Sequence, residues 1–312
     1  MNVLYLIAGI LLLIVGGDFL VKGSVSLSLK FNISKWIIGL TVVSFATSAP
    51  ELIVSLNAAI DGHPDLALGN VVGSNIANLA LVLAFILAGY GLQASWKEIG
   101  FDWLWMIAIS ALLPIALIST GGLNFMWGLL FVLILVSYMM VQIRKSKNEV
   151  VEMEDEVASA AMLKPLPTVG FLLLGAIALY AGSEVLIEGA VGLASTLGVS
   201  ERVISISMVS VGTSIPELAA SVIAVKKKEG ALSVSNLIGS NIFNICSVLG
   251  ITAIIHPITS LDPSLLRVDV WVMLAVALSL LVWTKMSKTK MGSHIFGFIL
   301  LSAYAIYILT IF

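Results

Sequence analysis

The most regular feature of the sequence is a succession of long apolar segments separated by short polar connections. Averaging hydropathy over a window of about 19 residues predicts ten membrane-spanning helices. The predicted spans lie near residues 3–21, 36–60, 66–90, 103–119, 123–143, 168–187, 202–225, 232–255, 268–284 and 293–311. A hydrophilic connection, residues 144–167, separates the fifth span from the sixth, and we interpret it as a solvated linker. The pattern therefore predicts an all-α polytopic membrane protein.

Composition supports a membrane protein and excludes several other classes. Charged residues make up 11% of the chain, hydrophobic residues make up 59%, and the mean hydropathy is +1.10. A soluble domain averages about 25% charged residues, so this chain has too few polar side chains to cover a water-exposed globule. The single cysteine, Cys246, excludes an internal disulfide framework. No basic tract is large enough to predict a nucleic-acid partner, and we interpret the apolar N-terminus as a retained first span.

Lysine and arginine are distributed unevenly over the predicted connections. The connections after spans 1, 3, 5, 7 and 9 carry 14 of the 16 basic residues, and the opposite side carries only Arg202 and Arg267. Basic residues are enriched in cytoplasmic loops. The distribution therefore predicts a multi-pass protein of the cell (plasma) membrane with the 144–167 linker in the cytoplasm and both termini outside.

The two halves of the sequence repeat one another. Shifting the chain by 166 residues aligns residues 47–83 with residues 213–249 without a gap, and 16 of the 37 pairs are identical. The same shift pairs Gly9 with Gly175, Gly16 with Gly182, Asp18 with Glu184, Gly23 with Gly189 and Ser34 with Ser200. Duplication of a purely structural unit would also give a repeat, but here many of the matched positions are polar.

The repeat covers spans 1–3 and 6–8, and an odd number of spans per half makes the halves enter the membrane from opposite sides. Inverted repeats of this kind are the architecture of secondary transporters, whose binding site lies at the interface of the repeats. We therefore predict two inverted five-helix repeats, residues 1–143 and 168–312.

Polar residues fall on one face of each of four predicted helices. In spans 2 and 7 they recur at spacings of three and four residues. They are Ser44, Thr47, Ser48, Glu51 and Ser55 in span 2, and Ser210, Thr213, Ser214, Glu217 and Ser221 in span 7. Spans 3 and 8 carry Asn70, Ser74 and Asn78, and Asn236, Ser240 and Asn244. These stripes predict a shared polar centre, although Ser55 and Ser221 are open to a packing role because serine is common at helix contacts.

Pro50 and Pro216 stand beside the two glutamates, inside otherwise apolar segments. A proline within a helix removes one backbone hydrogen bond and displaces the carbonyl four residues earlier, which predicts free carbonyls at Ala46 and Gly212. At membrane depth such carbonyls need a neighbour or a cavity. Together with carboxylates they suit a hard cation such as Ca²⁺, which takes about 6–8 oxygen ligands. No histidine or cysteine joins the set, which argues against zinc, copper or iron.

The two carboxylates carry an energetic penalty inside a membrane. An acidic residue at the centre of a membrane helix costs about 2.5–3.5 kcal/mol on the insertion scale. A cation bound by Glu51 and Glu217 would offset this cost. The alternative is that both side chains are protonated or hydrogen-bonded and only tie helices together. A membrane enzyme would need a nucleophile with a base, or a metal with nitrogen ligands, and the sequence places neither at depth, so we predict neither enzymatic activity nor a cofactor.

At these positions the sequence resembles a known family. The segments ATSAPE and GNVVGSNIAN, and GTSIPE and SNLIGSNIFN, are similar to the two α-repeats of the Ca²⁺/cation antiporter superfamily, in its sodium/calcium exchanger branch of prokaryotic type. The resemblance implies ten helices, with helices 2, 3, 7 and 8 broken around a central site that clusters four cation positions. It also implies that helices 1 and 6 slide as a pair.

The resemblance implies a role for each polar residue. Calcium would be bound by the carboxylates of Glu51 and Glu217 and the carbonyls of Thr47 and Thr213. Sodium would be bound by Ser48, Ser74, Ser214 and Ser240 and by the carbonyls of Ser44 and Ser210, whose extra hydroxyls depart from the family pattern. Asn78 and Asn244 would complete the central site. Potassium-dependent relatives carry aspartate at the position of Asn244, so asparagine argues against potassium co-transport.

The implied function is secondary active antiport of Na⁺ against Ca²⁺ by alternating access, mainly as calcium extrusion. Its partners would be these two ions and the lipid bilayer, and the protein would function as a monomer. A proton-coupled exchanger of calcium or another divalent cation remains an alternative, because buried glutamates can titrate. A cation channel would also line a path with oxygen atoms, but it would conduct without an obligatory counter-ion.

Overall fold

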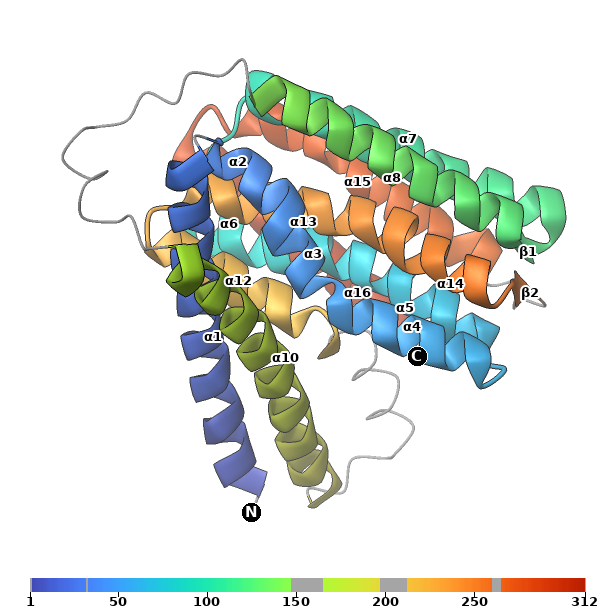
Figure 1. The fold of residues 1–312 in the computed structure, drawn as a ribbon, viewed down its shortest axis with the longest axis horizontal. Coiled ribbons are helices and arrows are strands. Elements are labelled where there is room, and N and C mark those ends of the chain that lie inside the picture. Colours follow the sequence, from blue (N-terminus) through green and yellow to red (C-terminus); the bar gives the residue numbers. More distant parts are fainter. Residues whose placement is uncertain (1, 32, 147–164, 197–211, 260–264, 312) are drawn as a thin grey trace. The chain divides into compact units, whose positions relative to one another are not determined.

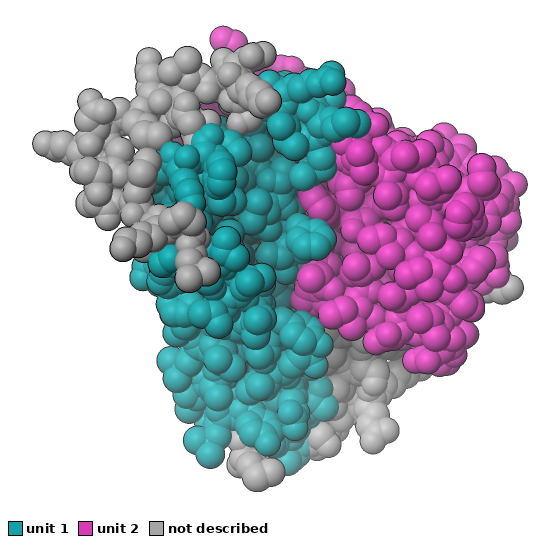
Figure 2. All heavy atoms as spheres, viewed as in Figure 1, with its two compact units in different colours: residues 1–47, 139–236 teal, residues 48–138, 237–312 magenta. Residues whose placement is uncertain are grey.

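The computed structural model describes the chain except for residues 1, 32, 147–164, 197–211, 260–264 and 312. It divides into two compact units, which Figure 2 shows in different colours. Unit 1 comprises residues 1–47 and 139–236, and unit 2 comprises residues 48–138 and 237–312. Each unit takes segments from both halves of the sequence. The units are therefore a different division of the chain from the repeats 1–143 and 168–312, which stay a prediction.

Unit 1 is built on two long helices and one interrupted helix (Figure 1). The long helices are α1 (Asn2–Phe31) and α10 (Pro165–Thr196). The interrupted helix consists of α2 (Lys35–Ile38), the π-helical segment η1 (Gly39–Val43) and α3 (Ser44–Thr47). The unit is completed by α12 (Ile215–Lys226), the end of α8 (Phe125–Ser146) and the start of α13 (Gly230–Phe243). Its buried apolar core is formed by Leu13, Leu20, Val21, Ile38, Val43, Leu179, Ala220, Ala224 and Leu232.

Helices α1 and α10 pack against each other at glycines and run antiparallel. A Cβ atom added at Gly16 would lie 2.7 Å from the backbone nitrogen of Leu179, and one added at Gly175 would lie 2.6 Å from that of Leu20. Residue numbers rise along one helix as they fall along its neighbour: Gly9 meets Leu186, Gly16 meets Leu179 and Gly23 meets Leu172. Small residues at such contacts let two membrane helices approach closely. The shift of 166 residues relates these two helices, and inverted repeats would produce this antiparallel pair.

Unit 2 is a helical bundle that contains two further interrupted helices. From the first half of the sequence it takes α4 (Ala49–Ile60), α5 (Pro64–Ala77), the π-helical segment η2 (Asn78–Leu83), α6 (Ala84–Tyr90), α7 (Trp96–Thr120), strand β1 (Gly122–Leu123) and most of α8. From the second half it takes the end of α13, the π-helical segment η3 (Asn244–Leu249), α14 (Gly250–Ile255), strand β2 (Ile258–Thr259), the π-helical segment η4 (Leu265–Asp269), α15 (Val270–Met286) and α16 (Lys290–Ile311). The segments η2 and η3 interrupt the helices that run from α5 to α6 and from α13 to α14.

The two strands are an addition to the predicted all-helical fold. Gly122 pairs with Thr259 and Leu123 pairs with Ile258, in antiparallel register. A ladder of two residues per strand is too short to leave an alternating pattern in the sequence, since strand patterns need about four residues or more. It joins the connection after α7 to the connection after α14.

In the described part of the chain, apolar side chains lie on the surface and many polar side chains are buried, as expected for a membrane protein. Large apolar side chains on α1, α8, α10 and α16 are exposed, whereas many Ser and Asn side chains and two Glu side chains are buried. Within the described ranges, eight helices are long and apolar enough to cross a membrane, and the bent pair Lys35–Thr47 and Ala49–Ile60 would be a ninth. Apart from the short ladder of β1 and β2, the protein is thus an all-α multi-pass membrane protein with bent and interrupted helices. Two predicted segments lie partly outside the described residues, the span 202–225 and the linker 144–167.

The elements of the two halves begin and end at matching positions. Adding 166 to the bounds of α4, α5 and η2 gives the bounds of α12, α13 and η3 without a difference of a single residue. The π-helical interruption thus recurs at Asn78 and at Asn244. π-helical turns are rare in proteins, and those that occur are often found at functional sites. The sequence repeat therefore has a counterpart in the local structure of both halves.

Candidate functional site

Two helix breaks, at Ser48 and Ser214, precede the two predicted carboxylates. Ser48 has φ −86° and ψ 2°, and Ser214 has φ −89° and ψ 1°, so the two breaks share nearly the same backbone conformation. Pro50 and Pro216 occupy the first turns of α4 and α12, where the missing N–H costs no helical hydrogen bond. Each proline therefore starts a new helix directly after the break.

Glu51 and Glu217 lie in the first turns of α4 and α12, and both side chains are 0% exposed. The positive end of a helix favours a carboxylate by about 0.3–1 kcal/mol. That gain is small against the several kcal/mol that desolvating a buried ion costs. Helix geometry alone therefore does not explain two buried carboxylates, whereas a cation bound beside them would.

The carbonyls predicted to be free differ between the two breaks. The carbonyl of Gly212 accepts a 2.9 Å hydrogen bond from the hydroxyl of Ser183 on α10, so a neighbouring helix satisfies it. The position that matches Ser183 in the repeat is Gly17 of α1, which has no hydroxyl. The carbonyl of Ala46 therefore lacks the corresponding donor.

In unit 2, Asn70 of α5 is hydrogen-bonded to the turn of α4 that carries Glu51. Its Nδ2 donates to Ser55 Oγ at 2.9 Å and to the Glu51 carbonyl at 3.3 Å, and all three side chains are buried. Ser55 thus has the packing role that its sequence position left open. Asn70 positions the first turns of α4 against α5.

In unit 1, Ser44 and Thr47 contact Asn236 of α13. The Ser44 hydroxyl lies 2.8 Å from the Gly39 carbonyl and 2.9 Å from the Asn236 carbonyl, and Thr47 Oγ1 lies 3.5 Å from Asn236 Oδ1. The extra hydroxyl of Ser44 therefore joins η1 to α13, and the group of Ser44 that remains a candidate ligand is its carbonyl. Its repeat counterpart, Ser210, lies outside the described residues.

Four buried oxygen atoms among the predicted ligands have no hydrogen-bond partner within the described part of the chain. They are Ser48 Oγ, Asn78 Oδ1 and Asn244 Oδ1 in unit 2, and Ser214 Oγ in unit 1. A buried polar group without a partner costs about 1–3 kcal/mol. Neutral oxygen atoms of this kind are the ligands that hard cations take. The remaining predicted serine ligands, Ser74 and Ser240, are 0% exposed, and Thr213 is half-buried.

Clusters of classical metal ligands do not offer another site in the described ranges. Those ranges contain no group of three or more His, Cys, Asp or Glu side chains that could hold a metal ion.

Sequence reasoning missed two asparagines, Asn75 and Asn241, that contact the predicted central ligands in unit 2. Asn78 Nδ2 donates to Asn241 Oδ1 at 3.3 Å, and Asn244 Nδ2 donates to Asn75 Oδ1 at 3.0 Å. The signal that could have found them is the repeat itself, because both halves contain Gly-Ser-Asn-Ile followed, one residue later, by a second asparagine. Only the second asparagine of each motif was assigned a role.

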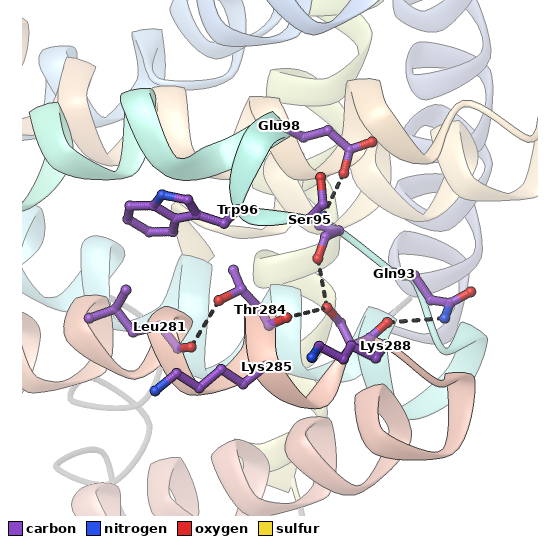
Figure 3. A pocket seen from close by; sticks show the side chains of 10 residues that line it. Gln93, Ser95, Trp96, Glu98, Leu281, Thr284, Lys285 and Lys288 are labelled. Atoms are coloured by element: carbon purple, nitrogen blue, oxygen red, sulfur yellow. Dashed lines mark hydrogen bonds between the residues drawn. The ribbon is translucent and has the colours of Figure 1, made fainter.

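A separate pocket in unit 2, of about 680 Å³, lies between the start of α7 and the end of α15 (Figure 3). None of the predicted site residues is among its lining residues. Polar groups that line it form hydrogen bonds with backbone atoms of the pocket itself. Glu98 accepts a 2.6 Å hydrogen bond from the backbone nitrogen of Ser95, and Ser287 donates to the Ala94 carbonyl at 2.7 Å. This pocket is therefore distinct from the candidate cation ligands.

Comparison with known proteins gives the family of the chain. The family model described as sodium/calcium exchanger protein matches residues 1–144 and 167–312. The chain is 36% identical to the proposed antiporter CaxA of Alkalimonas amylolytica, over 96% of this chain and 95% of that protein. It is 32% identical to the inner membrane protein YrbG of Escherichia coli, over 92% and 90% of the two chains. It is 28% identical to the sodium/calcium exchanger MaX1 of Methanosarcina acetivorans, over 90% and 91%.

Solved structures agree with this family. The sodium-calcium exchanger NCX_Mj, soaked with zero Na⁺ and Ca²⁺, is similar with a TM-score of 0.83 and 27% identity, over 99% of this chain and 98% of that chain. The same exchanger soaked with 10 mM Na⁺ and 10 mM Sr²⁺ gives a TM-score of 0.82, over 99% and 97%. The family model covers both halves of the sequence and the structural similarity covers nearly the whole chain. The protein therefore belongs to the sodium/calcium exchanger family, and it is a membrane cation antiporter and not an enzyme.

Proposed function

We propose that the protein exchanges Na⁺ for Ca²⁺ by alternating access and mainly extrudes calcium. The observation that carries this proposal is the pair of fully buried carboxylates, Glu51 and Glu217, in the first turns of repeat-related helices. Two carboxylates match the charge of one Ca²⁺, and their oxygen atoms are the ligand type that this ion takes. Na⁺ also binds oxygen atoms, so one set of ligands can serve both ions in turn.

Charge counting explains why such a site would exchange ions and not leak them. With both carboxylates ionised and no ion bound, the site carries a charge of −2, whose movement through a closed apolar bundle is costly. One Ca²⁺ or two Na⁺ would cancel this charge, and three Na⁺ would leave +1. Loaded forms would therefore change access more readily than the empty form. A stoichiometry of three sodium ions is an implication of the family, since counting alone also allows two.

The proposed ligands follow the motif positions. Calcium is held by the carboxylates of Glu51 and Glu217 and the carbonyls of Thr47 and Thr213. Sodium is held by Ser48, Ser74, Ser214, Ser240 and the carbonyls of Ser44 and Ser210, with Asn78 and Asn244 at the centre. The burial of the described members of this set, apart from the half-buried Thr213, supports the assignment. So do the four buried oxygen atoms that lack hydrogen-bond partners within the described residues.

In the proposed cycle, α1 and α10 move as one body. Their backbones meet at glycines from Gly9 to Gly23 on α1 and from Gly175 to Gly189 on α10. Both helices also expose large apolar side chains, which lipid can solvate while the pair moves within the hydrocarbon core of the bilayer. We further propose that the protein works as a monomer in the cell membrane, with both termini outside and the 144–167 linker in the cytoplasm.

The decisive experiment is calcium uptake into proteoliposomes under two different gradients. Vesicles loaded with Na⁺ and diluted into Na⁺-free buffer containing ⁴⁵Ca²⁺ should accumulate calcium, and equal Na⁺ on both sides should abolish the uptake. A pH gradient with the same concentration ratio across the membrane, in the absence of Na⁺, should drive no calcium uptake. Uptake under the pH gradient alone would establish the proton-coupled alternative, and calcium entry without any counter-ion would establish a channel. Vesicles that contain the Glu51→Gln, Glu217→Gln double variant provide the matched background.

A further inference from the structure

The buried centre of unit 2 contains two asparagines beyond the proposed ligand set. Asn75 and Asn241 are 1% and 2% exposed, and the shift of 166 residues relates them to each other. We propose that they are positioning residues: they fix the amide orientation of Asn244 and Asn78, so that each of these presents Oδ1, and not Nδ2, to the transported cation. The proposal rests on the proposed role of Asn78 and Asn244 as ligands of the central site.

The first set of contacts fixes Asn244. Nδ2 of Asn75 donates to the backbone carbonyl of Asn241 at 3.2 Å. A carbonyl oxygen can only accept, so Asn75 must direct its Nδ2 there and its Oδ1 the other way. That Oδ1 accepts the 3.0 Å hydrogen bond from Nδ2 of Asn244. The amide of Asn244 is thereby oriented, and its Oδ1 is left buried with no partner in the part of the chain that the structure describes.

The second set of contacts fixes Asn78 by the same logic. Nδ2 of Asn241 lies 3.7 Å from the sulfur atom of Met106. A thioether is a weak acceptor and has no proton to donate, so this contact favours Nδ2 of Asn241, and not Oδ1, on the side of Met106. Oδ1 of Asn241 accepts from Nδ2 of Asn78 at 3.3 Å. The Oδ1 atom of Asn78 is again buried without a partner among the described residues.

The two sets of contacts are related by the repeat and cross between its halves. Asn75, from the first half, holds Asn244 of the second half, and Asn241, from the second half, holds Asn78 of the first. In both, a group that can only accept fixes the direction of every later hydrogen bond. Both end at an amide oxygen, which is a cation ligand, whereas an inverted amide would present N–H groups that repel a cation. Partners that orient a ligand in this way commonly change metal affinity 10–100-fold when they are removed.

The test is a double-mutant cycle read out as ion affinity. Asn75→Ala should weaken Ca²⁺ binding to the purified full-length protein about tenfold. The dissociation constant can be measured from the rise in melting temperature with Ca²⁺ concentration, because a ligand that binds only the folded state stabilises it by RT ln(1 + [L]/Kd). In the background of Asn244→Ala, the same substitution should cost less than about twofold, because the amide that it orients is already gone.

Matched controls separate positioning from a general loss of structure. Asn75→Ala in the background of Asn78→Ala should keep its full effect, because Asn75 makes no side-chain hydrogen bond with Asn78 in the structure. Ser293→Ala removes a buried hydroxyl that contacts Trp283 in the same unit, and it should lower the melting temperature without changing the dissociation constant. If Asn75→Ala does not fold, Asn241→Ala in the Asn78→Ala background provides the equivalent cycle.

The outcomes also separate this inference from the proposed function. Additive effects of Asn75→Ala and Asn244→Ala in a wild-type background that binds Ca²⁺ would overturn the positioning role and leave the exchanger proposal intact. An unchanged dissociation constant in Asn75→Ala would do the same. If the wild-type protein is not stabilised by Ca²⁺ or Na⁺ at all, the exchanger proposal fails and the positioning role fails with it.

Discussion

The two helix breaks at Ser48 and Ser214 have nearly the same backbone conformation and the same types of residue, but they differ in the hydrogen bonds that neighbouring helices make to them. Each places a serine at the break, a proline in the next turn and a buried glutamate directly after the proline. Behind the second break, however, Ser183 donates a hydrogen bond to the Gly212 carbonyl, and the repeat offers no such hydroxyl behind the first. The serine, proline and glutamate of each break are thus repeated in both halves, whereas the hydrogen bond from Ser183 to the Gly212 carbonyl is not.

The helices α1 and α10 differ in a corresponding way. Asp18 of α1 forms ion pairs with Lys22, at 2.7 Å, and with Lys227 at the end of α12, whereas its repeat counterpart Glu184 is exposed. α1 also approaches α12 closely, since a Cβ added at Gly17 would lie 2.9 Å from the side chain of Ile223. α12 is therefore held by α1, and the break in front of it is held by α10. We expect the second break to be the stiffer of the two.

The strongest test of the similarity between the breaks is to neutralise each glutamate in turn. Glu51→Gln and Glu217→Gln should each lower sodium-driven calcium uptake at least about 100-fold. Each substitution leaves one carboxylate, whose single negative charge cannot balance the charge of Ca²⁺. Proteoliposome ⁴⁵Ca²⁺ uptake measures the effect. Glu98→Gln, at the exposed start of α7, should leave uptake near the wild-type rate. Near-normal exchange in either variant at the breaks would remove that glutamate from the site and end the functional equivalence of the two halves.

The next largest effect should come from the glycine contact between α1 and α10. A side chain at Gly175 would meet the backbone of Leu20, so Gly175→Val should destabilise the protein by at least about 1–3 kcal/mol, the usual cost of overpacking. Gly170→Val is the matched control on the same helix, because a Cβ there meets nothing within 4 Å. Thermal unfolding in detergent measures both. Equal melting temperatures for the two variants would mean that the close contact does not exist.

Much of this organisation could be predicted from the sequence, because a charged residue in a membrane helix is costly and is therefore usually found at a functional site. The apolar segments predicted the helical membrane fold, and the paired Pro50–Glu51 and Pro216–Glu217 predicted where two helices break. The repeat predicted that the second half would copy the local structure of the first, and the matching element bounds agree. The family implied by the two motifs is confirmed by the match over residues 1–144 and 167–312.

What the sequence could not supply is which helices become neighbours. The hydrogen bond from Ser183 to Gly212 joins residues that no helical spacing relates, and the contact of Asn75 with Asn244 joins the two halves. Spacing along one helix places residues on a face, but it does not say what that face meets. The hydroxyl of Ser44 shows the same limit. By position it belongs with the ligands, and in the structure it lies within hydrogen-bond distance of two carbonyls of unit 1, those of Gly39 and Asn236.

The unequal support of the breaks can be tested by removing the hydroxyl behind the second one. Ser183→Ala leaves the Gly212 carbonyl without its donor, and a buried polar group in that state costs about 1–3 kcal/mol of stability. Backbone hydrogen exchange should increase at residues 213–217 and stay unchanged at residues 47–51. Ser137→Ala, which removes an exposed hydroxyl bonded to its own helix, should change neither segment. Equal increases at both breaks would show that the second is not specifically held by α10.

The smallest effect should come from the ion pairs of Asp18, because they are partly exposed. Asp18→Asn should lower the melting temperature slightly, in keeping with about 0–1 kcal/mol for such pairs, and the loss should shrink as salt is raised. Glu184→Gln, at the matching position of α10, should have no effect at any salt concentration. A double-mutant cycle with Lys227→Met isolates the contact with α12. If Asp18→Asn and Glu184→Gln behave alike at low salt, the ion pairs do not distinguish α1 from α10, and the hydroxyl of Ser183 is left as the main difference between the two breaks.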